Sequence, residues 1–288
     1  MLPGVKQPHS VLAIARSRCN MVLMRRSPAA LLALLVLAPA AADAQVTQVN
    51  LTYDTYAASL EVMRMHVFFG LGPWNYRINL DYHTTGLVGF FYRGHQVNTV
   101  RGLWTDEHAA PLEFHGAGVW HGQERRTLID YENGQPDVKQ LEPPQTSERE
   151  SVPADMQRNT MDTLSALAEL MRNVDLRHTC DTTVHTFDGR RVLEIVARNG
   201  GTDSLEATGR SSFTGPAMRC DFEGREIAGF LIGDDDPNDR KPLHGSAWLA
   251  PVAPEAAPLP VRISFQTRWF GTATMYLTSA TPAKAPVP

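Results

Sequence analysis

The sequence predicts a mainly β protein: a single antiparallel curved sheet, or an open half β-barrel, of about 10–13 strands with one covering helix. Three observations predict this fold. Short segments alternate apolar and polar side chains, which is typical of strands with one buried and one wet face. The separators between these segments are short enough for hairpins, which join antiparallel neighbours. A single segment has the spacing of an amphipathic helix. We expect one domain over residues 45–278.

The N-terminus has the pattern of an export signal. Arg25 and Arg26 precede an apolar run over residues 29–38, and Ala-Asp-Ala follows at residues 42–44. A basic segment, a short apolar segment and an A-x-A site are typical of a cleavable secretory signal peptide. We therefore expect residues 1–44 to be the signal peptide, cleavage after Ala44, and a mature protein in the periplasm.

The signal does not depend on the first 20 residues, so translation can begin as late as Met21 or Met24. The alternative interpretation of the apolar run is a membrane anchor. An anchor needs about 20 apolar residues, and Pro39 and Asp43 interrupt the run too early. The mature chain has no second apolar stretch long enough to span a bilayer.

The mature chain is acidic. The signal segment holds five of the 27 Lys and Arg residues and one of the 31 Asp and Glu residues, which leaves 22 basic against 30 acidic residues and a net charge of −8. Binding to nucleic acid needs a basic patch that displaces counterions. We therefore expect no nucleic-acid partner.

The first three strands are expected near residues 49–53, 63–69 and 76–82, where apolar and polar residues alternate. The second and third supply the candidate ligand-lining residues, which are Met63, Met65, Val67, Phe69, Tyr76, Ile78, Leu80 and Tyr82. Aromatic rings and methionines are adaptable cavity liners. A filled barrel core gives the same pattern, so both interpretations stay open.

The middle of the chain continues the strand pattern. Further strands are expected over residues 97–104, 112–120, 125–131 and 138–141. Asn133-Gly134 separates the last two and is a strong signal for a tight hairpin turn. Residues 84–94 break the alternation with three glycines among apolar residues, which predicts a short apolar helix or a flap.

The amphipathic helix is expected near residues 160–174. Its apolar positions are Met161, Leu164, Leu167, Ala168, Met171 and Val174. Asn159 or Thr160 is the expected N-cap, and Asp162 favours the positive end of the helix dipole. Strands then resume over residues 182–187, 190–198, 218–232, 245–250, 261–267 and 272–278. Residues 279–288, rich in Pro and Ala, are expected to be a disordered tail.

The segment CDTTVHTFDGRR, residues 180–191, holds a thiol, a histidine, two carboxylates and two guanidiniums. Asp188-Gly189 lies between two strand-like runs and predicts a hairpin turn. Arg190 and Arg191 follow it on opposite faces, so at least one needs a carboxylate partner. The mature chain has one other cysteine, at position 220. An even number of cysteines in an exported protein indicates a disulfide; two free thiols, or one reactive thiol, are the alternatives.

The motif also carries a family resemblance. The pieces that match are Cys180 with F-D-G-R-R, Cys220 before a strand ending in Ala-Gly-Phe230, Y-D-T-Y at residues 53–56, Thr85-Gly86, and L-P-V-R at residues 259–262 before Gly271. Over residues 49–278 the chain resembles the bacterial exported family known as domain of unknown function 3108. The resemblance implies an exported protein with a curved antiparallel sheet, similar in shape to carriers that ferry lipoproteins across the periplasm. The family has no assigned activity and lends no catalytic residues.

Two patterns invite a metal site. Asp234, Asp236 and Asn238 match the first three ligand positions of a calcium loop, but its later glycine and glutamate positions are occupied by Asp239 and Gly245. The histidines, His108, His115 and His121 among them, lack any paired zinc spacing. We expect a solvated acidic loop, surface histidines, no metal and no cofactor.

Catalysis has weak support in the sequence. Ser211 and Ser212 lie in a segment without the Gly-x-Ser-x-Gly elbow of hydrolases. We therefore expect no catalytic residue and a non-catalytic binding module for an apolar or lipid-like molecule. A cell-envelope structural or assembly factor with a protein partner is the alternative, and a hydrolase is the third possibility.

Overall fold

The computed structural model describes residues 47–91, 93–105, 108–120, 122–145, 148–233, 240–267 and 271–283. The expected signal peptide, the acidic segment 234–239 and residues 284–288 lie outside these ranges. Within them the chain forms one antiparallel sheet of 13 strands and two helices, which confirms the expected fold class. Neither helix is long and apolar enough to cross a membrane.

The sheet follows the chain almost without crossovers. Its order is β7-β6-β5-β4-β3-β2-β1-β13-β12-β11-β10-β9-β8, so β1 and β13 pair at its centre and β7 and β8 are its two edges. The first half comprises β1 (Thr47–Ala57), β2 (Leu60–Leu71), β3 (Asn75–Thr84), β4 (His95–Trp104), β5 (Ala109–Trp120), β6 (Gln123–Glu132) and β7 (Gln135–Glu142). The second half comprises β8 (Thr182–Phe187), β9 (Val192–Leu205), β10 (Gly215–Ala228), β11 (Leu243–Ala250), β12 (Leu259–Thr267) and β13 (Gly271–Pro282).

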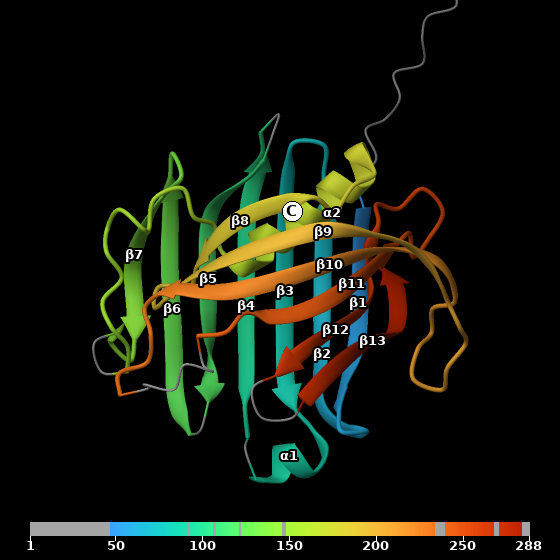
Figure 1. Cartoon of the computed structure of the whole chain (residues 1–288), viewed down its shortest axis with the longest axis horizontal. Helices are drawn as coiled ribbons and strands as arrows, with labels where there is room; N and C mark the ends of the chain where they lie inside the picture. Colours follow the sequence, from blue (N-terminus) through green and yellow to red (C-terminus); the bar gives the residue numbers. More distant parts are fainter. Residues whose placement is uncertain are drawn as a thin grey trace, which may run out of the picture. The chain divides into compact units, whose positions relative to one another are not determined.

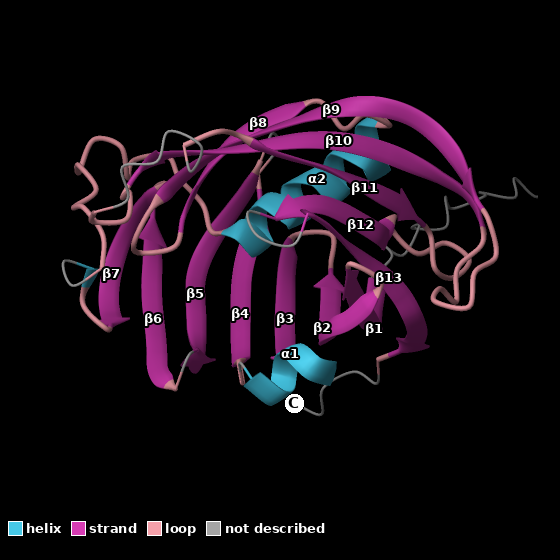
Figure 2. Cartoon of the chain, turned by 60° about the horizontal axis from the view of Figure 1, so that its bottom comes forward, coloured by secondary structure: helices cyan, strands magenta, loops and turns pink. Residues whose placement is uncertain are grey.

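The sheet folds over so that one half lies across the other. Strands β8 to β12 cross above β2 to β6, and helix α2 (Thr163–Arg177) lies between the two layers (Figures 1 and 2). Nine of its 15 residues are buried, on more than one side of the helix. The expected covering helix is therefore an interior helix, because it packs against both layers.

Helix α2 begins later than expected. Asp162, and neither Asn159 nor Thr160, is the N-cap: one carboxylate oxygen accepts hydrogen bonds from the backbone N–H of Leu164 and Ser165, both at 2.9 Å. Met161 cannot be helical, because its backbone N–H and C=O pair with His185 and Phe187 on the edge of β8.

Two further boundaries differ from expectation. The tail was expected to start at residue 279, but β13 continues to Pro282, and residues 279–282 pair with residues 49–52 of β1. Backbone pairing there outweighs the Pro/Ala composition of the segment. Strand β10 ends at Ala228, not at residue 232, because Gly229 has a left-handed φ of 82°.

The turns and the disulfide match their predictions. Asn133 and Gly134 both have positive φ and join β6 to β7. Residues 86–91 form the short apolar helix α1 (Gly86–Phe91). Cys180 and Cys220 are bonded, with their Cα atoms 5.4 Å apart, which joins the segment before β8 to β10.

Candidate functional site

A cavity of about 950 Å³ lies inside the folded sheet, at the N-terminal end of α2. Its walls come from the inner faces of β3 to β6, the first residues of α2, the β8–β9 turn, and the segments around residues 148 and 231. The lining residues are Leu80, Tyr82, Gln96, Asn98, Phe114, Gly116, Trp120, Gln123, Arg125, Thr127, Glu148, Arg149, Asp162, Thr163, Leu164, Asp188, Arg190, Arg191 and Leu231.

Strand register explains where the cavity begins. One row of paired residues across β3 to β6 is apolar: Ile78, Val100, Phe114 and Ile129. The next two rows on the same face are mostly polar or lack a side chain: Leu80, Asn98, Gly116 and Thr127, then Tyr82, Gln96, Gly118 and Arg125. The inner face therefore changes along the strands from a packed core to an open, polar floor.

Glycines hold part of this floor open. An added Cβ at Gly116 would meet the side-chain ends of Asn98 and Gln96, at 2.9 and 3.2 Å. These two amides therefore lie across the glycine, where they hydrogen-bond each other at 3.1 Å. A larger residue at position 116 would displace them and reduce the cavity.

The charged wall is built from salt bridges between segments far apart in the sequence. Both terminal nitrogens of Arg125 on β6 donate to the two carboxylate oxygens of Glu148, at 3.1 and 2.6 Å. This hydrogen bond is the main reason why the pKa of Glu148 lies below its ordinary value. Glu148 is therefore a carboxylate that fixes Arg125 at the cavity wall.

A second pair joins the same wall to β10. Arg149 donates to Glu226 at 2.9 Å and to the carbonyl oxygen of Gly229 at 2.7 Å. Glu226 also lies 3.5 Å from Arg191, whose Nε donates to Asp188 at 3.1 Å. The partially buried carboxylate of Glu226 thus serves two guanidiniums.

The FDGRR segment, residues 187–191, forms the β8–β9 turn, which is part of the cavity wall. The carboxylate of Asp188 accepts the backbone N–H groups of Arg190 and Arg191, at 2.9 and 3.0 Å. Gly189 has a φ of 87° and lies against Leu141 and Thr127, so the β8–β9 turn packs on β6 and β7. The hairpin turn at Asp188-Gly189 is as expected, and the two arginines after it enter the cavity wall.

Arg190 is the most buried of the cavity arginines, with 10% of its side chain exposed. Its Nη1 donates to the carbonyl oxygen of Pro143 at 2.7 Å, and the nearest carboxylate oxygen, on Glu148, is 3.9 Å away. Its Nη2 has no hydrogen-bond partner within the described part of the chain. Burial, followed by the nearby positive charge of Arg125, lowers the pKa of Arg190.

The N-cap of α2 closes the opposite side of the cavity. Asp162 accepts the Ser165 hydroxyl at 2.5 Å, and Ser165 in turn accepts the Tyr76 hydroxyl at 2.7 Å. Burial raises the pKa of Asp162 to about 6, against the opposing effect of the hydrogen bonds that it accepts from Ser165 and Leu164. The oxygens of Asp162 are thus committed to the helix end.

The candidate ligand-lining residues divide into two groups. Leu80 and Tyr82 line the cavity. Val67, Phe69, Tyr76 and Ile78 are core residues, each at most 7% exposed, and Met65 packs against that core. These five belong to the same core cluster as the buried side chains of α2. Met65 and Val67 lie beside Tyr82 and Leu80 in the register but on β2, one strand away from the cavity. Met63, which pairs with Thr84, does not line the cavity either.

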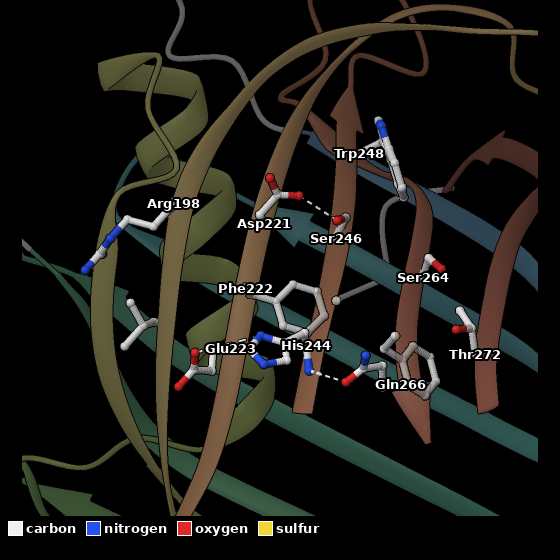
Figure 3. Close-up of a pocket in the computed structure, with 13 residues that line it drawn as sticks. Arg198, Asp221, Phe222, Glu223, His244, Ser246, Trp248, Ser264, Gln266 and Thr272 are labelled. Atoms are coloured by element: carbon white, nitrogen blue, oxygen red, sulfur yellow. Dashed lines mark hydrogen bonds and ion pairs between the residues drawn. The ribbon is translucent and has the colours of Figure 1, made fainter. Parts of the chain in front are cut away.

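An open hollow of about 670 Å³ lies on the outer face of β9 to β13 (Figure 3). Its polar side chains alternate with buried residues such as Cys220 and Ala247, which places them outside the sheet. The Ser246 hydroxyl donates to Asp221 at 2.6 Å, and His244 lies 3.8 Å from Glu223. The hydroxyl of Ser246 is therefore oriented by a carboxylate, and the hollow lacks the enclosing walls of the interior cavity.

The other candidates from the sequence do not converge on one place. Ser211 and Ser212 donate to the backbone carbonyls of Phe213 and Leu277. His108 approaches Glu169 of α2 at 3.1 Å. No group of three or more His, Cys, Asp or Glu side chains suited to a metal occurs in the described ranges.

Sequence reasoning did not single out Arg125, Glu148 or Arg149. Each lies in a segment whose local pattern is that of an ordinary strand or polar loop. The available signal was the pair of arginines after Asp188-Gly189, at a turn that must pack against another part of the sheet. Of the carboxylates that pair with the wall arginines, only Asp188 lies close in sequence to its arginine, Arg191.

These features define a β-barrel-like protein: an open antiparallel sheet that wraps around one helix and retains an interior cavity with a charged wall. The chain belongs to the family described as protein of unknown function DUF3108, which matches residues 52–278. The family assignment confirms the resemblance carried by the cysteines and the FDGRR segment.

A solved structure supports the fold. The chain is similar to a β-barrel-like protein of the domain of unknown function DUF1849 from Brucella abortus, with a TM-score of 0.50 and 12% sequence identity. The likeness covers 84% of this chain and 100% of the other. At this identity the likeness shows the fold alone. The search of curated proteins finds no match.

Proposed function

We propose that the protein is an exported, non-catalytic binding module whose interior cavity takes an apolar or lipid-like molecule. The observation that carries the proposal is the cavity itself, which lies between strands β3 to β6, the start of α2 and the β8–β9 turn. Apolar side chains from β3, β5, helix α2 and the segment after β10 line it, namely Leu80, Tyr82, Phe114, Trp120, Leu164 and Leu231. These six side chains supply the apolar surface for a lipid-like molecule, and the other lining residues, apart from one glycine, are polar or charged groups that could hold a polar end.

Export is supported by two independent features. The N-terminal segment has the charge and apolar pattern of a cleavable signal, and the disulfide between Cys180 and Cys220 is of the kind that persists in oxidising compartments. N-terminal sequencing of the mature protein tests this part. The expected first residue is Gln45, and a mature protein that retains residues 29–38 would contradict it.

The binding proposal is tested by native mass spectrometry and organic extraction of protein purified from the periplasm. We expect a bound lipid-like molecule, and we expect Gly116→Leu to reduce its occupancy by filling the cavity. Gly224→Leu is the matched control, because Gly224 is also a strand glycine but has open space at its Cβ position. Empty wild-type protein, or equal occupancy in both variants, would refute the proposal.

A second candidate function, a cell-envelope assembly factor, is favoured by helix α1. This short helix consists of glycines and apolar residues, and none of them is buried. Leu87, Phe90 and Phe91 are 64%, 74% and 71% exposed. A photo-crosslinking residue at Phe90 should then capture one discrete protein in intact cells, while the same residue at exposed Arg225 should not. The absence of a Phe90-specific adduct would reject this candidate.

A further inference from the structure

The charges around the β8–β9 turn are unevenly paired. Four arginines of the cavity wall, Arg125, Arg149, Arg190 and Arg191, share three carboxylates there: Glu148 and Asp188 of the wall and Glu226 beside it. Each carboxylate is already the closest partner of another arginine. Among the described residues of the wall, Arg190 is therefore the guanidinium without a carboxylate of its own.

The position of Arg190 makes this imbalance costly. Its side chain is nine-tenths buried, and its Nη2 lacks a hydrogen-bond partner in the described chain. The like charges of Arg125 and Arg149 act on it together with the carboxylates of Glu148, 3.9 Å away, and Asp188, which are shared with other arginines. A buried guanidinium stays protonated and loses much of its hydration, so it needs an opposite charge nearby. The fold holds it there through Pro143 and the turn at Asp188.

We propose that Arg190, with Arg125 and Arg149 beside it, receives the oxyanion head group of an amphiphilic ligand, either a carboxylate or a phosphate. The proposal rests on the proposed function, since the apolar chain would occupy the rest of the cavity. A guanidinium presents two parallel N–H groups that match carboxylate and phosphate oxygens. Leu80, Phe114 and Leu164 supply apolar surface for the chain elsewhere in the cavity.

Asp162 limits where the head group sits. It is the one cavity carboxyl without an arginine contact, and its oxygens already accept hydrogen bonds from Leu164 and Ser165. A second anion beside it would be repelled. The head group therefore lies toward Arg190, and the chain runs past the N-terminus of α2.

The direct test compares ligands that share one chain and differ in the head group. Delipidated full-length mature protein is titrated calorimetrically with dodecanoate, dodecyl phosphate and dodecanol at one pH and ionic strength. We expect both anions to bind at least about tenfold more tightly than the alcohol, as for a buried charge-assisted hydrogen bond. Equal affinity for anions and alcohol would overturn the assignment of the head group while leaving the proposed function standing.

Variants locate the effect. Arg190→Met should weaken both anions about tenfold and leave dodecanol unchanged, whereas Arg126→Met, on the outer face of the strand that carries Arg125, should change neither. An anion preference that persists in Arg190→Met would overturn the proposal. If that variant does not fold, the comparison of anion and alcohol in the wild type decides.

Two other results of the titrations would refute other parts of the proposal. Failure of all three ligands to bind would overturn the proposed function, and this proposal with it. Binding of inorganic phosphate as tight as that of dodecyl phosphate would show a free-anion site and overturn the amphiphile assignment.

Discussion

The backbone of Gly229 lies directly against the carbonyl oxygen of Arg190: a Cβ added to this glycine would lie 2.2 Å from that oxygen. The segment after β10 therefore holds the β8–β9 turn in place from behind, while Asp188 caps it from within. The position of the cavity arginines depends on this close approach between residues 39 positions apart.

Gly229→Ala should therefore destabilise the protein by about 3 kcal/mol or more, since a left-handed φ and a backbone clash act together. Gly201→Ala is the control, because Gly201 has a similar φ, 89° against 82°, and open space at its Cβ position. It should cost about 1 kcal/mol. Urea unfolding measures both. Equal losses would show that the contact with Arg190 adds nothing.

The disulfide should stabilise the fold as one unit. Cys180 and Cys220 are 40 residues apart and fully buried, and a loop of that size corresponds to about 4 kcal/mol in the chain-entropy account. Cys180→Ser should lower the melting temperature as much as reducing agent does, and adding Cys220→Ser should cost little more. Two titratable thiols in denatured, non-reduced protein would contradict this prediction.

The helix cap should make stability depend on pH. Burial raises the pKa of Asp162 from 3.8 to about 6, so the folded chain binds this proton more tightly than the unfolded chain does. Ionisation of Asp162 therefore costs stability as the pH rises from about 4 to about 6. Asp162→Asn keeps an acceptor for the helix N-terminus without the charge.

The variant Asp162→Asn should gain about 2 kcal/mol relative to the wild type across that pH window. Asp137→Asn, at an exposed position of β7, controls for the loss of one negative charge. Asp162→Ala should be less stable than Asp162→Asn at every pH, by about 1 kcal/mol, because the cap is lost. A constant difference between wild type and Asp162→Asn from pH 4 to 7 would contradict the pKa shift.

Local patterns predicted most of the sheet. The alternation over residues 182–187 matches β8 at both ends, and Asp188-Gly189 forms the expected turn, because neither depends on distant residues. The Pro/Ala composition of residues 279–282 predicts a disordered tail, which is wrong. Composition does not reveal that another strand is available for these residues to pair with. Their partner, residues 49–52 of β1, lies more than 220 positions away.

The charged wall could not be predicted for the same reason. Arg190 depends on Pro143 and Glu148, more than 40 positions earlier, and Arg149 depends on Glu226. Nor does any local pattern reveal which end of the sheet α2 fills. That choice follows from Met161, which pairs with the edge of β8 and so sets where the helix begins.

The salt bridge between Arg125 and Glu148 should contribute to stability in a pH-dependent way. Glu148→Gln removes the carboxylate nearest to both Arg125 and Arg190, and it should lower the free energy of unfolding by about 2 kcal/mol at pH 7. Because the hydrogen bond from Arg125 lowers the pKa of Glu148, this stability is fully present above the ordinary pKa of 4.5. It is lost as the pH falls through the lower, folded-state value.

Wild type and Glu148→Gln should thus converge in acid and differ most at neutral pH. Glu124→Gln serves as the control. Glu124 lies on β6, the strand of Arg125, and also pairs with an arginine, Arg126, but it is 70% exposed, where a salt bridge stabilises little. Urea unfolding across pH 3 to 8 distinguishes the two. The prediction fails if the difference in unfolding free energy does not depend on pH, or if Glu124→Gln loses as much stability as Glu148→Gln. Either result would mean that the interior position of Glu148 adds nothing to stability. The cavity wall would then tolerate an arginine that has no anionic partner.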